Sequence, residues 1–207
     1  MITNQQSEHE REIYLKRVHQ YFNRFVPFTD EDLRLLVPYI EIRSFQKKHL
    51  VVSLDEVDKY FNIIIKGLVR KYILLGKGEV TLQISGEGHI IHSEISFHTQ
   101  TPSETLVETI EPTVLFSMSY DNLQKVYEQY PKMERLGRMI VTHVFIKKDQ
   151  RDFYQLKSTT RERFMAYVEK HADMLQRVPQ KYIASYLNIK PETFSRLKHL
   201  LRHKKNT

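Results

Sequence analysis

The chain has 207 residues, 41% of them hydrophobic, and contains no cysteine. This length and composition predict one large globular domain or two small ones, with a hydrophobic core. The lack of cysteine excludes disulfides, thiolate zinc sites, cysteine nucleophiles and cysteine-bound iron–sulfur clusters. There is no run of 18 apolar residues, and the first residues are polar, so neither a membrane span nor a signal peptide is predicted. We therefore expect a cytoplasmic protein without a membrane partner.

The net charge of +7 is concentrated near the C-terminus. From Lys157 onward there are twelve Lys and Arg against four Asp and Glu, which gives +8 for this quarter and −1 for the preceding residues. Such a basic segment is typical of a module that contacts nucleic-acid phosphates. For the last charges, Lys204 and Lys205, a solvated basic tail is the alternative interpretation.

Two helices are predicted at the start of the chain. Apolar residues at helical spacing predict the first over about 8–25, and Pro27 interrupts it. Thr29 and Asp32 have the spacing of a capping box, which predicts a short second helix that begins there.

From residue 39 to about 120 the hydrophobic pattern changes to short alternating or β-branched runs separated by glycine and proline turns. Eight strands are expected, at 39–45, 50–54, 60–65, 68–75, 79–84, 89–91, 106–110 and 113–117. Strands that recur at roughly ten-residue spacing predict an antiparallel sandwich or barrel and not a parallel α/β sheet.

Helical spacing returns after residue 120, with a short helix at 121–130 and a long helix at about 133–155. The apolar stripe of the long helix is wider than one contact surface needs, and it includes Leu136, Ile140 and Val144. We interpret this helix as the contact of a two-fold homodimer. The alternative is a helix that packs only on its own domain.

A second capping box, Thr159 with Glu162, predicts another helix, and we expect a hinge at 157–159. The predicted domains are therefore a sensor domain with the dimerisation helix over 1–155 and a DNA-binding domain over 156–207.

The segment 176–198 has the pattern of a helix-turn-helix. Proline at 179 and 191 can open the two helices, because the N–H that proline lacks has no helical partner at that position. Asn188 lies at the turn, where a left-handed backbone is required, and the small Ala184 allows the helices to cross closely. The apolar positions that would hold the helices together are Ile183, Leu187, Ile189, Phe194 and Leu197.

The second of these helices, about 191–202, is the candidate base-reading element. We expect its apolar face to point inward, with Phe194, Leu197, Leu200 and Leu201. Glu192 and Arg196, one helical turn apart, have side chains that recognise cytosine and guanine in a major groove. A surface ion pair between them is the alternative. The predicted base-reading set is Glu192, Thr193, Ser195 and Arg196, and the predicted phosphate contacts are Lys181, Lys190, Lys198 and Arg202.

The order of strand-rich domain, long helix and helix-turn-helix resembles the Crp/Fnr superfamily of bacterial transcription regulators, most specifically at 61–70 and 178–196. The resemblance implies an α+β fold, with a cyclic-nucleotide-binding-like jelly-roll barrel, a dimerisation helix and a winged helix-turn-helix. It also implies a homodimer that binds double-stranded DNA and contacts RNA polymerase. Glu192 and Arg196 match the base-reading Glu and Arg of the family, whereas Pro191 stands where activators carry a further Arg. Little sequence follows Arg202, so we expect a short or absent wing.

The resemblance also places an effector pocket at 93–105. Members that bind cyclic AMP use a Gly-Glu pair followed by Arg-Ser or Arg-Thr. Here Glu94 and Ser103 are in place, but Ser93 replaces the glycine and Pro102 stands at or near the arginine position.

No Lys or Arg occurs between Lys77 and Lys125. Burying a cyclic phosphate without a cation beside it costs roughly several kcal/mol of desolvation free energy. We therefore expect that cyclic nucleotide is not bound in the usual way. A small organic or anionic effector bound differently, or no effector, is expected instead, and no cofactor is predicted.

Histidines 89, 92 and 98 cluster around this pocket, which raises a haem or metal ligand as an alternative. Their spacing is not that of a metal motif, so no metal site is predicted. No nucleophile–base set or glycine-rich phosphate loop occurs, so we do not expect an enzyme. A different class of function also remains open, namely a ligand-sensing module whose C-terminal helices dock a protein partner instead of DNA.

Overall fold

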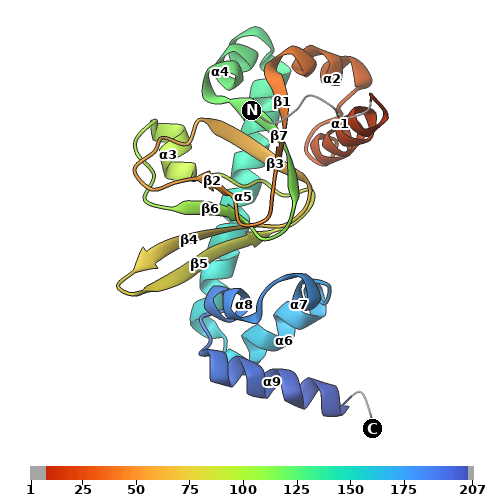
Figure 1. The fold of residues 1–207 in the computed structure, drawn as a ribbon. Helices are drawn as coiled ribbons and strands as arrows, with labels where there is room; N and C mark the ends of the chain where they lie inside the picture. The colour runs from red at the N-terminus through yellow and green to blue at the C-terminus, as the bar shows by residue number, and fades with distance from the viewer. Residues whose placement is uncertain (1–7, 205–207) are drawn as a thin grey trace.

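The computed structural model describes the backbone of residues 8–204 and the side chains of residue 10 and residues 12–200. An N-terminal barrel with flanking helices is followed by the long helix α5 and a group of C-terminal helices (Figure 1). The elements in chain order are α1 (Glu8–Phe22), α2 (Asp30–Leu36), the 3-10 helix η1 (Val37–Tyr39), β1 (Ile40–Phe45), β2 (Leu50–Val52), β3 (Tyr60–Lys66), β4 (Val69–Leu75), β5 (Gly78–Ser85), α3 (Glu94–Thr99), β6 (Leu106–Thr109), β7 (Thr113–Ser119), α4 (Tyr120–Gln129), α5 (Pro131–Lys157), α6 (Thr160–Lys170), α7 (Met174–Arg177), α8 (Gln180–Tyr186) and α9 (Pro191–Lys204).

The strands form two antiparallel sheets with the orders β1-β7-β3 and β2-β6-β4-β5. The predicted α+β fold with an N-terminal β-barrel is therefore confirmed. The strand predicted at 89–91 is wrong, because this segment forms only an isolated bridge, between Ile63 and Ile90. A turn with positive φ at Gly88 and the start of α3 at Glu94 leave it too short for a regular ladder.

Both predicted capping boxes are present. The Thr29 side chain accepts from the backbone N–H of Asp32 at the start of α2, and Thr159 and Glu162 make the same arrangement at α6. Helix α5 continues to Lys157, two residues past the proposed domain boundary, and the helical break lies at 158–159. Capping by Thr159 satisfies N–H groups that α6 leaves open, which explains where the long helix can stop.

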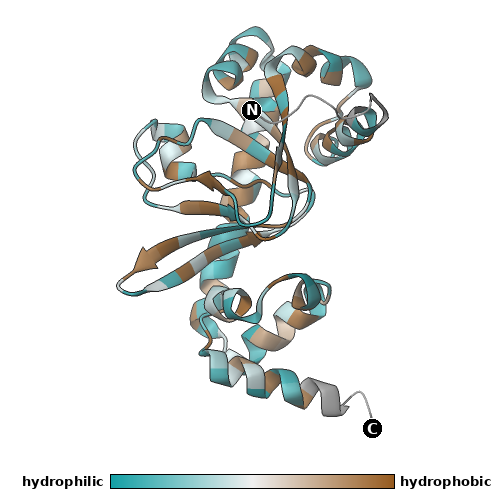
Figure 2. Ribbon diagram, in the orientation of Figure 1, coloured by the Kyte–Doolittle hydropathy of each residue, from teal (hydrophilic) through white to brown (hydrophobic). Residues whose placement is uncertain are grey.

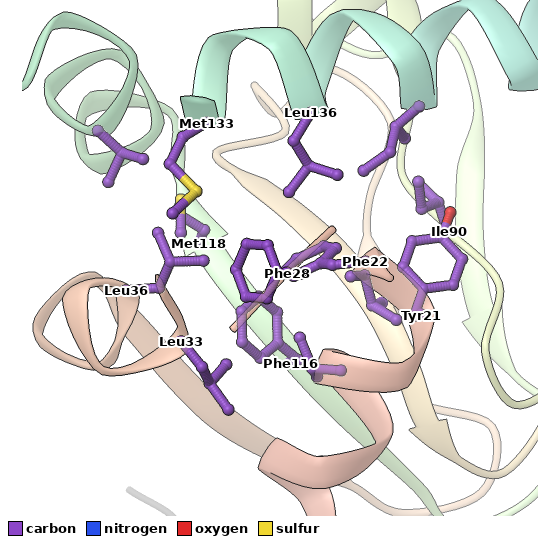
Figure 3. Packing of buried hydrophobic residues seen from close by; sticks show 14 of the residues in the cluster. Tyr21, Phe22, Phe28, Leu33, Leu36, Ile90, Phe116, Met118, Met133 and Leu136 are labelled. Carbon is purple, nitrogen blue, oxygen red and sulfur yellow. The ribbon is translucent and has the colours of Figure 1, made fainter. Parts of the chain in front are cut away.

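The main core joins α1 and α2 to the barrel and to α5. Figure 3 shows Leu136 of α5 pointing toward Phe28 and Phe116. The rings of Phe22 and Phe28 lie 5.0 Å apart and meet edge to face, a favourable aromatic geometry. The first half of α5 is thereby fixed to its own barrel.

This packing corrects the side chains predicted for the dimer face. Leu136 and Ile140 are each only 4% exposed, and Val144 packs against the same core. At roughly 100° per residue, a helix that buries these positions turns a different set outward. The exposed apolar residues of α5 are Val141, Phe145, Ile146, Phe153 and Leu156.

The C-terminal helices share a second core with the barrel. Phe164 of α6 and Phe194 of α9 are buried, with ring centroids 5.1 Å apart. Leu68 and Ile110 from the barrel belong to the same cluster. Hydrophobic colour also lies at the tip of the β4–β5 hairpin (Figure 2), where Leu75 is 66% exposed. The helix-turn-helix is thus fixed against the barrel, while parts of α5 and the hairpin leave apolar surface uncovered.

Candidate nucleic-acid interface and effector pocket

Helices α8 and α9 form the predicted helix-turn-helix. Asn188 adopts the expected left-handed backbone, with φ 53°, and Ile189 N–H donates to the Ala184 carbonyl over 2.9 Å. Ala184 and Phe194 are each 1% exposed, which places them at the crossing of the helices. Pro191 is the first residue of α9, whereas Pro179 immediately precedes α8.

The outer face of α9 is open to solvent. Glu192, Ser195 and Arg196 are exposed, and Thr193 and Lys198 are half-buried. Among the described residues Glu192 and Arg196 do not pair with each other or with another charge, so the alternative of a surface ion pair between them is not seen.

The phosphate candidates are placed less uniformly. Lys190 and Lys181 are exposed, and Lys181 Nζ lies 5.0 Å from the ring centroid of Tyr182. Arg202 lies in α9, but its side chain is outside the described residues, as is that of Leu201. Leu200, predicted to point inward, is 56% exposed. The inward prediction for Leu200 is therefore wrong, because Phe194 and Leu197 already provide the contact of α9 with its neighbours.

Two arginines of the basic C-terminal quarter bond to other parts of the chain and so are not available as open surface charges. Arg163 of α6 donates to the Leu187 carbonyl at 3.0 Å and to the Ser158 carbonyl at 2.6 Å. Arg177 pairs with Glu87 at 2.8 Å and also with Glu111, and the hydrogen bonds that it donates to these carboxylates raise its pKa above the usual value. Net charge alone could not distinguish these residues from the exposed lysines.

Helix α8, not α9, is the helix of the pair that contacts the barrel. Thr81 N–H donates to Ser185 Oγ at 2.9 Å, and the Arg70 guanidinium lies 3.8 Å from the ring centroid of Tyr182. Arg151 of α5 donates to the carbonyls of Leu82 and Tyr186. Figure 1 shows α9 at the end of the molecule, with α8 between it and the barrel. Helix α9 extends to the last described residue, so the expected short or absent wing lies outside the described part of the chain.

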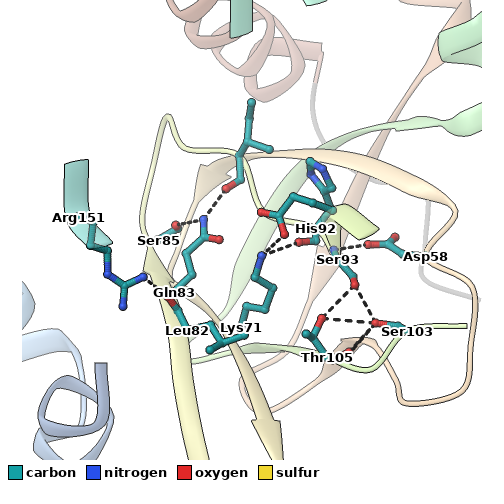
Figure 4. A network of polar contacts seen from close by, with 12 residues as sticks. Asp58, Lys71, Leu82, Gln83, Ser85, His92, Ser93, Ser103, Thr105 and Arg151 are labelled. Atoms are coloured by element: carbon teal, nitrogen blue, oxygen red, sulfur yellow. Dashed lines mark hydrogen bonds and ion pairs between the residues drawn. The ribbon is translucent and has the colours of Figure 1, made fainter. Parts of the chain in front are cut away.

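The predicted effector residues meet around α3, where they bond to one another (Figure 4). Ser103 Oγ lies 2.9 Å from Ser93 Oγ, and Thr105 Oγ1 donates to Ser93 Oγ at 3.0 Å. Ser93 N–H donates to Asp58 Oδ2 at 2.7 Å, and burial raises the Asp58 pKa to about 6. Pro102 is exposed and makes a bridge with Val57. Ser93 and Ser103 lie together as the resemblance implied, but with Thr105 and Asp58, which were not predicted, they form a network that satisfies its own hydrogen bonds.

The pocket also contains a cation that the sequence analysis missed. Lys71 of β4 is buried, and its Nζ pairs with Glu94 and donates to the His92 carbonyl at 3.3 Å (Figure 4). Burial tends to raise the Glu94 pKa, but Lys71 outweighs it and holds that pKa below the ordinary value. Lys71 lies outside the segment between Lys77 and Lys125 that contains no Lys or Arg. The pairing of β4 with β6 brings it next to the predicted effector residues. The expectation of a pocket without a cation is therefore wrong, although the cation is already neutralised.

His92 lies beside this pair, with its ring 5.3 Å from that of Phe97 and 5.8 Å from that of His98. Neither ring nitrogen of His92 has a hydrogen-bond partner, and burial lowers its pKa to about 4. His89 is exposed. No group of three or more His, Asp or Glu side chains in the described part of the chain is arranged to hold a metal ion.

The buried His92 predicts a specific acid sensitivity. Its pKa is about 4 when folded, against 6.5 in the unfolded chain, so only the unfolded chain takes up this proton as pH falls from 6.5 to 4. The associated stability is complete above this window and is lost through it. Between pH 7.5 and pH 5, the unaltered chain should lose about 2 kcal/mol of unfolding free energy through His92. His92→Phe should not show this part of the loss. Urea unfolding of both proteins at the two pH values measures this, and an identical pH dependence would contradict it.

The barrel, the long helix and the exposed helix of a helix-turn-helix together form the architecture that the resemblance in sequence implies. Residues 42–130 match the family model of the cyclic nucleotide-binding domain. No curated protein matches the chain in sequence. Every helix of the described residues is too short or too polar to span a membrane.

Among solved structures, the chain is similar to FixK2 from Bradyrhizobium japonicum, with TM-score 0.67, 19% identity, and coverage of 80% of this chain and 86% of FixK2. It is also similar to CLP, a c-di-GMP-responsive global regulator of Xanthomonas campestris, with TM-score 0.66, 14% identity, and coverage of 84% and 91%. A protein from Eubacterium rectale described as a transcriptional regulator of the Crp/Fnr family matches with TM-score 0.64, 14% identity, and coverage of 89% and 88%. At these identities the likeness establishes the fold.

Proposed function

We propose that this protein is a sequence-specific, homodimeric DNA-binding transcription regulator of Crp/Fnr type. The observation that carries the proposal is the open outer face of α9, with Glu192 and Arg196 exposed and unpaired among the described residues, while α8 takes up the contact with the barrel. A helix held in this way can enter a major groove without first leaving its own domain.

In this proposal some residues of the helix-turn-helix contact bases and others contact phosphates. Arg196 reads guanine and Glu192 reads cytosine, with Thr193 and Ser195 as further base contacts. Lys181, Lys190, Lys198 and Arg202 bind phosphates and set the position of α9 on the duplex.

The dimer is proposed through the free apolar face of α5, and the side chains differ from those predicted from sequence. Phe145 is 68% exposed, Phe153 61% and Leu156 87%. Large apolar side chains gathered on one exposed face are typical of a protein–protein contact. A two-fold contact along α5 would present two copies of α9 to two half-sites. CLP and the protein from Eubacterium rectale are described as regulators, which agrees with this assignment.

The effector is proposed to be something other than a cyclic nucleotide bound in the usual way. Lys71, the buried cation beside the predicted effector residues, already pairs with Glu94, so an incoming phosphate would have to displace that carboxylate. Contact with RNA polymerase and a cytoplasmic location belong to the same proposal.

The salt dependence of DNA affinity tests the proposal. Binding through phosphates releases counterions, so log K should fall linearly with log salt, with a slope of about −0.9 for each phosphate contacted. We expect Lys190→Gln to make this slope less steep by the equivalent of about one phosphate contact per subunit. Fluorescence anisotropy with duplex DNA selected from a random library, at several salt concentrations, measures both slopes.

An exposed lysine outside α9, Lys16, provides the matched control, and Lys16→Gln should leave the slope unchanged. A DNA affinity that is flat with salt, or equal slopes for Lys190→Gln and the unaltered chain, would contradict phosphate contact. Such a result would favour the alternative, in which the C-terminal helices dock a protein partner.

A further inference from the structure

A groove of about 760 Å³ lies between α1 and β3, on the side of the barrel away from the effector residues. Ile13 and Arg17 of α1 form a wall, Arg24 lies in the turn that follows α1, and the end of β3 contributes Lys66. Glu87 and Arg177 lie at the boundary with the C-terminal helices, and in Figure 1 α1 and α7 are on the same side of the molecule. This volume is within the range of small-molecule sites in proteins.

Three cations of the groove have no acidic partner among the described residues. Arg17 is exposed and donates one hydrogen bond, to the Ile65 carbonyl at 2.6 Å. The Arg24 guanidinium lies 5.4 Å from the ring centroid of Tyr21, and Lys66 is exposed. Glu10 is the acid that lines the groove besides Glu87, which pairs with Arg177. The groove therefore has an excess of positive charge.

The positive charge continues beyond the groove. His143 of α5 has its pKa lowered first by burial and then by Lys147, Arg24 and His89. Lys147 of α5 therefore lies near enough to Arg24 for both to act on His143, so the basic surface of the groove extends toward α5.

Apolar surface lies next to these charges. Ile13 is 40% exposed, whereas Tyr14 and Ile65, which also line the groove, are buried in the core beneath it. A guanidinium binds a carboxylate through two parallel hydrogen bonds, and the groove offers two exposed guanidinium groups, on α1 and in the turn that follows it. The exposed Ile13 side chain would contact the hydrocarbon part of the same molecule.

We propose that this groove binds a carboxylate carried on an apolar body, at a site separate from the effector pocket. Arg17, Arg24 and Lys66 bind the carboxylate, and Ile13 contacts the apolar body. Because Arg177 of α7 lines the far end and pairs there with the barrel, an occupied groove touches both parts of the molecule. This inference goes beyond the proposed function and does not depend on DNA binding.

Isothermal titration of the full chain with decanoate, and with decanamide as the neutral counterpart, tests the proposal. Arg17→Gln combined with Arg24→Gln should weaken decanoate binding at least about tenfold, since charge-assisted hydrogen bonds are lost. The matched control combines Lys16→Gln with Arg34→Gln, two exposed cations outside the groove, and should bind decanoate as the unaltered chain does. Ile13→Glu, at an exposed position, should also weaken binding by placing a like charge in the groove.

Weaker binding of decanamide than of decanoate by the unaltered chain, together with selective loss in the groove variants, would support the site. No decanoate binding by the unaltered chain, equal affinities for the two compounds, or equal loss in the control variant would overturn it. DNA affinity measured on the same preparations tests the proposed function separately, because none of the substituted residues lies on α9.

Discussion

Arg196→Ala is expected to abolish the preference for operator over random DNA while weak, salt-sensitive binding remains. The reason is that Arg196 is exposed on α9 and unpaired among the described residues, so its guanidinium is free to bind guanine. A bidentate contact of this kind discriminates by about 1–3 kcal/mol at each half-site. The lysines that bind phosphates are unchanged in this variant, so non-specific affinity should persist.

The measurement is the ratio of affinities for a selected operator and for a shuffled duplex, at one fixed salt concentration. Arg161→Ala is the matched control, because Arg161 is an exposed arginine on α6 outside the recognition helix. It should reduce both affinities slightly and leave the ratio intact. An unchanged ratio for Arg196→Ala would remove the base-reading assignment.

Phe145→Asp combined with Leu156→Asp is expected to convert the dimer to monomers. Both side chains are exposed on α5, at 68% and 87%, so the barrel core should remain folded while the proposed contact receives four charges per dimer. A monomer binds one half-site at a time, and operator affinity should fall by about 100-fold or more because the linked second site is lost. Sedimentation equilibrium and operator titration measure the two effects.

Gln150→Asp is the control for this experiment, since Gln150 is exposed on α5 but is not part of the apolar stripe. It should remain dimeric with unchanged operator affinity. If the double variant also sediments as a dimer, the contact between subunits lies on another surface, for which the exposed tip of the β4–β5 hairpin would be the next place to test.

The local elements could be predicted because their signals are short in sequence. Thr29 and Thr159 act on N–H groups three residues away, and Asn188 marks its own left-handed turn. Alternating side chains predicted seven of the strands for the same reason, since strand faces repeat every two residues. The eighth, at 89–91, had the right composition but no length of chain in which to build a ladder.

The candidate pocket shows where this kind of prediction stops. Ser93, Glu94 and Ser103 were found because they lie within one short segment, but Lys71 belongs to a strand more than twenty residues earlier and pairs with Glu94. Likewise, the twelve basic residues of the C-terminal quarter looked equivalent in sequence, and only contacts with Glu87 and Leu187 separated Arg177 and Arg163 from the exposed set.

The sequence by itself determined the fold class, seven of the strands, the longer helices but not the short α3 and α7, and the helix that carries Glu192 and Arg196, because hydrophobic spacing and capping act over a few residues. The tertiary structure decided which face of α5 is buried, which cation occupies the pocket and which helix of the pair rests on the barrel. These depend on contacts between residues far apart in the chain. Periodicity can show that a helix has an apolar face, but only packing shows which surface covers it.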